Sequence, residues 1–221
     1  MKVCIVIPAY NEEKTIARIV AEAKRYSKDV IVVDDGSSDR TYNLAKKGGA
    51  TVLRHAVNIG AGFATVTGND YAVSKGCDVI VNLDSDGQHS ASAVPDAIEF
   101  LKKGGYDIVL GSRFLESTDR MPLILKLGNR FLTFMNGKIF GSNISDTQSG
   151  FRILTSDAWK KLAIKSVDYS ICSEISARIG IKRLKYAEIP IETIYLDKFK
   201  GTTLFDGVKI FVNMMRWWSK K

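Results

Sequence analysis

Short apolar runs alternate with helical patterns along the first half of the chain. The first, second and fourth of these runs are rich in valine and isoleucine and end in polar residues, as buried strands of a parallel sheet do, and the run at 50–53 is weaker. The runs cover residues 3–7, 30–33, 50–53, 78–83 and 107–110. Between them, apolar residues at helical spacing predict helices over residues 16–23, 41–47, 64–74 and 94–102. This alternation predicts an α/β layered sheet, in which ligands bind at the carboxyl ends of the strands.

The second half of the chain is less regular. Residues 123–139 are apolar with basic insertions, and residues 205–218 predict a final amphipathic helix. Helical patterns also cover residues 157–162 and 174–179, and residues 184–189 predict a strand. Because no internal repeat and no linker divides the chain, we expect a single domain.

Composition places the chain among ordinary soluble globular proteins. Of its 221 residues, 45% are hydrophobic and 25% are charged, which excludes low-complexity, collagenous and disulfide-rich miniprotein classes. No apolar run reaches the ~18 residues of a transmembrane helix, and the N-terminal run is too short for a signal peptide. The 32 basic and 24 acidic residues give a net charge of +8. Such an excess favours an anionic partner, namely phosphates, a membrane surface or nucleic acid, or serves solubility alone.

The cysteines are few and widely spaced. Cys4 and Cys77 sit in or beside apolar runs, and Cys172 lies far from both. We therefore expect Cys4 and Cys77 to be buried free thiols, which favours a reducing compartment.

Polar segments follow three of the predicted strands, at residues 8–12, 34–37 and 84–88. Any one of them could be a turn or a helix cap, but three at one sheet edge predict a site. Asp84 and Asp86 carry the most specific chemistry, because neighbouring carboxylates repel unless a cation lies between them. Oxygen ligands together with a diphosphate suit Mg²⁺ or Mn²⁺, and Gln88 could add a neutral oxygen.

The order of these motifs resembles that of family 2 glycosyltransferases. The motifs are PAYNE at 8–12, DDGSSDRT at 34–41, NIGAG at 58–62, DSDGQH at 84–89 and GSR at 111–113. A further motif, DTQSGFR at 146–152, resembles the branch of dolichyl-phosphate mannose and glucose synthases. The chain departs from many relatives at Ala61, where they carry a lysine.

The resemblance implies a GT-A fold, which is a Rossmann-like, mostly parallel sheet flanked by helices, with a metal site at the paired aspartates. It also implies inversion at the anomeric carbon. It places four residues around the base and ribose of the donor: Pro8, Tyr10, Glu12 and Asp35. The metal, and through it the donor diphosphate, would be held by Asp84, Asp86 and Gln88. Ser85 would line the same pocket, and Arg113 would lie near the donor sugar and the acceptor phosphate.

Residues 120–145 contain no acidic residue and could hold an anionic acceptor. A phosphate monoester has a second pKa of about 6, so it is largely ionised at neutral pH and needs positive charge rather than a general base. The basic residues of this segment are Arg120, Lys126, Arg130 and Lys138. Beside them runs an apolar stripe of Leu127, Phe131, Phe134 and Met135. This pattern suits a lipid phosphate at a membrane, or a helix that packs on its own core.

The last predicted helix has a comparable pattern. Its apolar stripe consists of Val208, Phe211, Val212, Met215 and Trp218, with Trp217 beside it. Basic residues surround the stripe: Lys209, Arg216, Lys220 and Lys221. Such a helix could lie among lipid headgroups, or it could dock on the core or on another subunit.

We therefore predict an inverting polyprenyl-phosphate glycosyltransferase that uses a GDP- or UDP-sugar at the cytoplasmic face of a membrane. The motif at 146–152 leans toward glucose-type relatives and hence UDP. Residues 1–113 would bind the nucleotide sugar, residues 114–203 the acceptor, and residues 204–221 form the amphipathic helix. The catalytic candidates are Asp86, Arg113 and Arg130.

Two alternatives stay open: a family 2 enzyme that acts on a sugar hydroxyl, and a sugar-nucleotide-binding protein without transferase activity. A homo-oligomer is compatible with the sequence, and no nucleic-acid-binding motif is recognised. We expect His89 at the rim of the site and Glu174 in a surface salt bridge.

Overall fold

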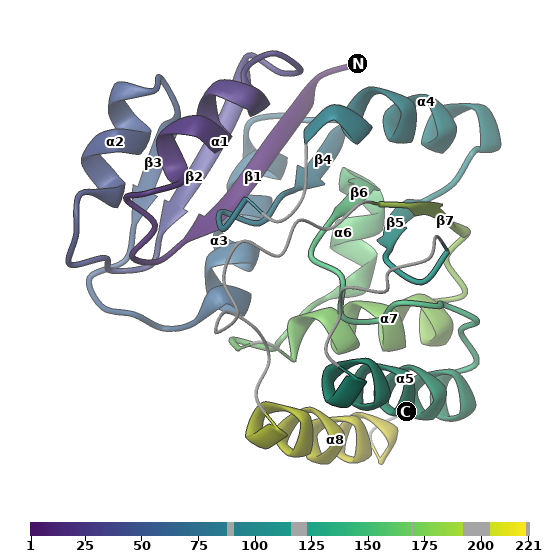
Figure 1. The fold of residues 1–221 in the computed structure, drawn as a ribbon. Coiled ribbons are helices and arrows are strands. Elements are labelled where there is room, and N and C mark those ends of the chain that lie inside the picture. The colour runs from purple at the N-terminus through teal and green to yellow at the C-terminus, as the bar shows by residue number, and fades with distance from the viewer. Residues whose placement is uncertain (88–90, 116–122, 169, 192–203, 220–221) are drawn as a thin grey trace.

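The computed structural model describes residues 1–87, 91–115, 123–168, 170–191 and 204–219. In this part of the chain, seven strands form one sheet in the order β3-β2-β1-β4-β6-β5-β7 (Figure 1). The strands are β1 (Val3–Ala9), β2 (Asp29–Asp34), β3 (Thr51–Arg54), β4 (Val79–Asn82), β5 (Ile108–Ser112), β6 (Arg152–Thr155) and β7 (Tyr186–Pro190). All neighbours pair in parallel except β6, which runs antiparallel to both β4 and β5. The expectation of a mostly parallel α/β sheet is confirmed.

The helices follow the predicted order. They are α1 (Ile16–Ala23), α2 (Thr41–Lys47), α3 (Ala61–Ser74), α4 (Val94–Gly104), α5 (Leu123–Phe140), α6 (Ser156–Leu162), α7 (Ile171–Lys182) and α8 (Leu204–Trp218), with the short 3₁₀ turn η1 (Ala91–Ala93) before α4. The sequence analysis missed only β6 among the described strands. The sheet takes strands from both sides of residue 113, so the division into a donor half and an acceptor half stays a functional prediction.

Each face of the sheet has its own hydrophobic core, because successive side chains of a strand point to opposite faces. In β1, Ile5 and Ile7 face the core that α1, α2 and α4 cover. Cys4 and Val6 face the core that α3, α6 and α7 cover. The polar segments begin at the carboxyl ends of β1, β2 and β4.

A third cluster joins α5, α7 and α8 on the side of α7 away from the sheet (Figure 1). Its buried members are Leu132, Phe140, Ala177, Ile210 and Met214. The C-terminal helix therefore docks on the protein's own core through Ile210 and Met214, one of the alternatives left open for it. Among the described residues, no helix is both long enough and apolar enough to cross a bilayer.

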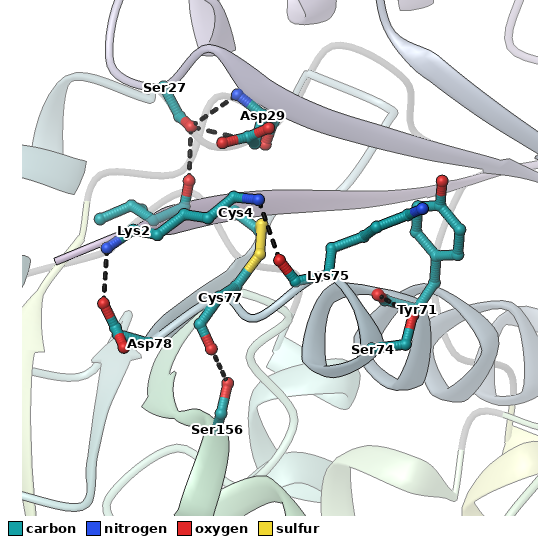
Figure 2. Close-up of a disulfide and its surroundings, with 11 residues drawn as sticks. Lys2, Cys4, Ser27, Asp29, Tyr71, Ser74, Lys75, Cys77, Asp78 and Ser156 are labelled. Atoms are coloured by element: carbon teal, nitrogen blue, oxygen red, sulfur yellow. Dashed lines mark hydrogen bonds between the residues drawn. A yellow bond between two sulfur atoms is a disulfide. The ribbon is translucent and has the colours of Figure 1, made fainter.

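The cysteine prediction is wrong for two residues. Cys4 in β1 and Cys77 just before β4 form a disulfide, which is buried between the two strands (Figure 2). Parallel pairing of β1 with β4 brings the chain before β4 beside β1, where the Cα atoms of Cys4 and Cys77 lie 6.0 Å apart, a usual separation for a disulfide. Cys172 is a free thiol. Because Cys4 and Cys77 are paired, the cysteines no longer favour a reducing compartment.

The disulfide closes a sequence separation of 73 residues, and we expect it to contribute about 4 kcal/mol to the free energy of unfolding by restricting the unfolded chain. Denaturant unfolding with and without reductant measures this contribution. Cys172→Ser, which keeps the pair, should respond to reductant as the wild type does, whereas Cys77→Ser should not respond. Equal stability of the wild type in both conditions would contradict the assignment.

Candidate active site

The three polar segments predicted from the sequence meet at one edge of the sheet. Their strands β2, β1 and β4 are neighbours and run parallel, so their carboxyl ends lie together. Ala9 pairs with Asp34 at the end of this ladder, and the Asp35 N–H donates to the Ala9 carbonyl at 2.8 Å. Tyr10 follows as an exposed residue, while Asp35 is buried.

Hydrogen bonds lock the first segment to the second. The Asn11 N–H donates to Ser37 Oγ at 2.9 Å, and the Ser38 N–H donates to Asn11 Oδ1 at 2.9 Å. Asn11 adopts a positive φ of 53°, a conformation that asparagine tolerates better than most residues. The Glu12 N–H donates to Thr41 Oγ1 at the start of α2, at 2.7 Å. Asn11 thus acts as the connector between the two segments, a role that the sequence analysis did not assign.

Thr15 connects the first segment to the third. Its hydroxyl lies 2.7 Å from the Ser85 carbonyl and 3.0 Å from Glu12 Oε2. Glu12 and Ser85 are both buried. The loops that carry Glu12, Asp35 and Ser85 are therefore fixed relative to one another, as a preorganised binding site requires.

Asp35 holds the loop of residues 55–60. Its Oδ1 accepts from the Ile59 N–H at 3.1 Å and lies 2.7 Å from His55 Nδ1, and its Oδ2 accepts from the Gly60 N–H at 2.7 Å. The other ring nitrogen of His55 lies 3.1 Å from Thr67 Oγ1 on α3. His55 is a site residue that the sequence analysis missed, because its spacing from Asp35 matches no local pattern.

The glycines of the NIGAG motif are required by packing. A Cβ on Gly60, whose φ is 126°, would lie 2.6 Å from the Val167 carbonyl oxygen. A Cβ on Gly62 would overlap the Asp168 carbonyl, and the Phe63 N–H donates to the Val167 carbonyl at 2.9 Å. This loop therefore packs directly on the segment between α6 and α7, so its glycines are explained without a lysine at position 61.

The paired aspartates follow β4, and Asp84 contacts the motif at 146–152. A Cβ on Gly150 would collide with both carboxylate oxygens of Asp84, so any other residue there would force the Asp84 side chain to move. Asp84 and Asp86 are both half-buried. Gln88, the third expected metal ligand, and His89 lie outside the described residues.

Arg113 is held by the same motif. Its Nε lies 2.6 Å from Asp146 Oδ2 and its Nη2 lies 2.8 Å from Asp146 Oδ1, which makes a bidentate ion pair. The Asp146 side chain is fully buried and that of Arg113 is 13% exposed. Glu188 of β7 accepts from Ser145 N–H and Oγ next to this pair. The guanidinium is therefore fixed in orientation and paired with a carboxylate.

The motif at 146–152 also contacts α5 and α7. Thr147 Oγ1 lies 3.0 Å from Thr133 Oγ1 of α5, and Gln148 Nε2 donates to Ser173 Oγ of α7 at 2.7 Å. Arg130 is exposed on α5 one turn before Thr133, so it lies near the motif without a described contact to Arg113. Arg120 falls outside the described residues.

Comparison with known proteins shows the family of this chain. The model of "Glycosyl transferase family 2" matches residues 4–163, most of the chain. This chain belongs to glycosyl transferase family 2. A UDP-N-acetylglucosamine–dolichyl-phosphate N-acetylglucosaminyltransferase of Methanococcus voltae is 33% identical over 96% of this chain and 94% of its own length.

Two further similarities extend the comparison. A dolichol-phosphate mannosyltransferase of Pyrococcus furiosus is 31% identical over 98% of this chain and 64% of its own length. The glucosyl-3-phosphoglycerate synthase of Mycobacterium tuberculosis has a similar structure, with a TM-score of 0.73 at 20% identity, over 97% of this chain and 79% of that one. The family 2 chain thus has the GT-A fold that its motifs imply.

The paired aspartates of this family 2 chain fit a hard divalent cation. Two carboxylates in one turn are the protein ligands that Mg²⁺ commonly uses, with substrate phosphates and waters completing the shell. In the part of the chain that the structure describes, no group of three or more His, Cys, Asp or Glu residues could hold a metal alone. The donor set therefore suits an ion that binds together with a diphosphate.

Glu174 requires a correction. It does pair with Arg178, at 3.2 Å, but its side chain is fully buried rather than at the helix surface. Its Oε2 accepts from the Lys165 and Ser166 N–H groups at 3.0 and 2.7 Å. Glu174 therefore fixes the segment between α6 and α7, against which the NIGAG loop packs.

Arg113→Ala should lower the free energy of unfolding by about 3 kcal/mol, because it leaves the buried Asp146 carboxylate without its charged partner. Denaturant unfolding measures the loss. Arg130→Ala, an exposed control, should change stability by no more than about 0.5 kcal/mol. If Arg113→Ala is as stable as the control, the N–H groups of residues 113 and 148, which also donate to the Asp146 carboxylate, are enough to stabilise it.

Proposed function

We propose that this chain is an inverting, metal-dependent transferase that moves a sugar from a nucleoside diphosphate to a polyprenyl phosphate at the cytoplasmic face of a membrane. The observation that carries the proposal is the contact between Asp84 and Gly150. It joins the paired aspartates of the donor edge to the motif that reaches Arg113, α5 and α7. Donor diphosphate and acceptor phosphate would meet across this contact.

The donor side would be organised by the locked loops. Tyr10 is exposed, so its ring is available to stack on a base, and the buried Glu12 and Asp35 hold the loops beside it in place. Asp84 and Asp86 would hold Mg²⁺ or Mn²⁺ near the diphosphate. The metal would offset the negative charge that develops on the leaving diphosphate. Because Thr15 fixes the Ser85 backbone, the paired aspartates need little reorganisation on binding.

The acceptor side would supply positive charge and no base. A lipid phosphate is ionised at neutral pH and can attack directly. Arg113, whose orientation Asp146 fixes, lies at the boundary of the two sides. Arg130 and Lys126 lie on one face of α5, whose Thr133 contacts Thr147. We therefore assign the acceptor phosphate to the space between Arg113 and this face.

A membrane surface fits the outer faces of α5 and α8. The exposed apolar side chains there are Leu127, Phe131, Phe134, Val208, Val212 and Trp218. The rings of Phe131 and Phe211 lie 5.9 Å apart, which joins the two helices into one patch. Exposed basic residues, including Arg130, Lys138 and Arg216, accompany it. An apolar patch with positive charge is suited to anionic lipid headgroups.

The names of a relative and of a structural neighbour indicate which nucleotide sugars to test first as donors. The Methanococcus voltae relative is named for UDP-N-acetylglucosamine, and the Mycobacterium tuberculosis neighbour was crystallised with Mn²⁺ and UDP-glucose. Labelled UDP-N-acetylglucosamine, UDP-glucose and GDP-mannose are incubated with the protein, Mg²⁺ or Mn²⁺, and a polyprenyl phosphate. The proposal predicts metal-dependent label in the lipid fraction from one of them. Label only on a sugar hydroxyl acceptor, or nucleotide binding without transfer, would support the alternatives.

Asp86→Asn should reduce transfer at least about a hundredfold, since it removes a charge that holds the metal and diphosphate in the transition state. Lipid-extracted label measures the rate, and thermal unfolding checks the fold. The matched control is Asp96→Asn on the exposed start of α4, which should keep wild-type turnover. Equal rates in the two variants would refute the metal assignment.

Phe134→Ser combined with Trp218→Ser should weaken binding to vesicles containing anionic lipid at least about tenfold. The reason is that the variant has lost two large apolar side chains whose transfer from water into the bilayer would favour binding. Vesicle flotation measures the bound fraction. Phe100→Ser is the control, since Phe100 is comparably exposed but lies on α4. Equal flotation of the double variant and the control would place the membrane contact elsewhere.

A further inference from the structure

The C-terminal helix is tied to the donor side of the molecule through residues 163–168, hereafter the α6–α7 segment. Lys209 Nζ of α8 lies 2.7 Å from Asp168 Oδ2. One turn further along α8, Asn213 Nδ2 donates to Ser170 Oγ at 2.9 Å, just before α7. Residues of α8 thus contact the connection between α6 and α7 at two neighbouring points.

The other side of the α6–α7 segment forms the wall on which the NIGAG loop rests. The Val167 carbonyl accepts from the Phe63 N–H at 2.9 Å, and Gly60 and Gly62 approach Val167 and Asp168 too closely for any Cβ. The Gly60 N–H in turn donates to Asp35 Oδ2 at 2.7 Å. A shift of Asp168 would therefore displace the backbone that holds the Asp35 carboxylate.

The α6–α7 segment is fixed at its beginning by a different helix. Glu174 of α7 accepts the Lys165 and Ser166 N–H groups and is itself buried and paired with Arg178. At its end, the Asp168 carbonyl accepts from the Ile171 N–H at 3.2 Å, whereas the Asp168 side chain is held by the Ser170 N–H and by Lys209 of α8. Burial of Asp168 opposes its ionisation, but hydrogen bonds from Lys209 and Ser170 outweigh this and hold the pKa of Asp168 below its usual value. Asp168 is therefore a charged partner for Lys209 at neutral pH.

We propose that Asp168 is a positioning residue for the donor nucleotide, and that its contact with Lys209 makes the affinity for the nucleotide depend on the seating of α8. The proposal rests on the proposed function, because it takes the ligand of the Asp35 side to be a nucleoside diphosphate. Asp168 acts through Gly60 and Asp35 and touches no substrate itself. Substitution of Asp168 should therefore change the affinity for the nucleotide and not the affinity for the acceptor.

Calorimetric titration of the whole chain with UDP and with GDP, in the presence of Mg²⁺ and without lipid, tests the proposal. Lys209→Met keeps the apolar stem and removes the charge, and Asp168→Asn removes the opposite charge. Each should raise the nucleotide Kd about fivefold, the lower end of couplings between sites, because the pair is partly exposed. The double variant should bind no more weakly than either single variant, since both remove one interaction.

Two controls separate positioning from general loss of structure. Arg216→Met removes another exposed basic residue of α8 and should leave the Kd within about twofold of wild type, the spread expected for an uninvolved surface site. Lys209→Arg should restore wild-type affinity because it keeps the charge. Thermal unfolding is measured for every variant. With 56% of its side chain exposed, Lys209 can be replaced without disturbing a core, so Lys209→Met decides the matter if Asp168→Asn folds poorly.

Wild-type affinity in a folded Lys209→Met variant would overturn this inference and leave the proposed function intact. A loss equal in Lys209→Met and Arg216→Met would also overturn it, since it would reflect the charge of α8 as a whole. If the wild-type chain binds neither UDP nor GDP, the proposed function fails and this inference fails with it.

Discussion

The parallel pairing of β1 with β2 and β4 ends three buried strands at one edge of the sheet, and the candidate site depends on this constraint. Both faces of these strands are buried, so a shift of register would exchange side chains between two closely packed cores of different shape. The polar segments that follow therefore leave the sheet at fixed places. Short hydrogen bonds through Asn11 and Thr15 then lock the loops to one another. The loops of the site are therefore held rigid by the buried strands that they follow and by the hydrogen bonds that join them.

The same constraint explains what could be predicted from the sequence. Buried parallel strands and amphipathic helices have local signatures, so the layers, the paired aspartates and the polar edge were all foreseen. β6 was missed because it has only four residues, begins with Arg152 and has no alternation. The disulfide and the His55–Asp35 contact depend on register and on loop packing between distant residues. Glu174 was misplaced at the surface for the same reason, because its partners lie in the preceding loop.

The second half of the chain divides its apolar residues between two tasks. Ile210 and Met214 of α8 are buried against α5 and α7, while Val208, Val212 and Trp218 stay exposed. Docking on the protein's own core is therefore confirmed for one face of α8, while contact of the other face with lipid or with another subunit stays a prediction. The inner face fixes α8 beside the α6–α7 segment, and the outer face is available to a surface. The motif at 146–152 joins this half to Arg113 through Asp146 and to Asp84 through Gly150.

The central claim is that the paired aspartates bind a divalent ion together with a nucleoside diphosphate. Titration of Mn²⁺ followed by electron paramagnetic resonance, with and without UDP or GDP, measures this most directly. Because the described site offers two carboxylates, the account predicts weak binding of Mn²⁺ alone. It predicts that one of the two nucleotides tightens the binding of Mn²⁺ at least about tenfold. Mn²⁺ should tighten the binding of that nucleotide by the same factor. The account would be contradicted if UDP and GDP each bound with the same affinity in Mn²⁺ as in chelator.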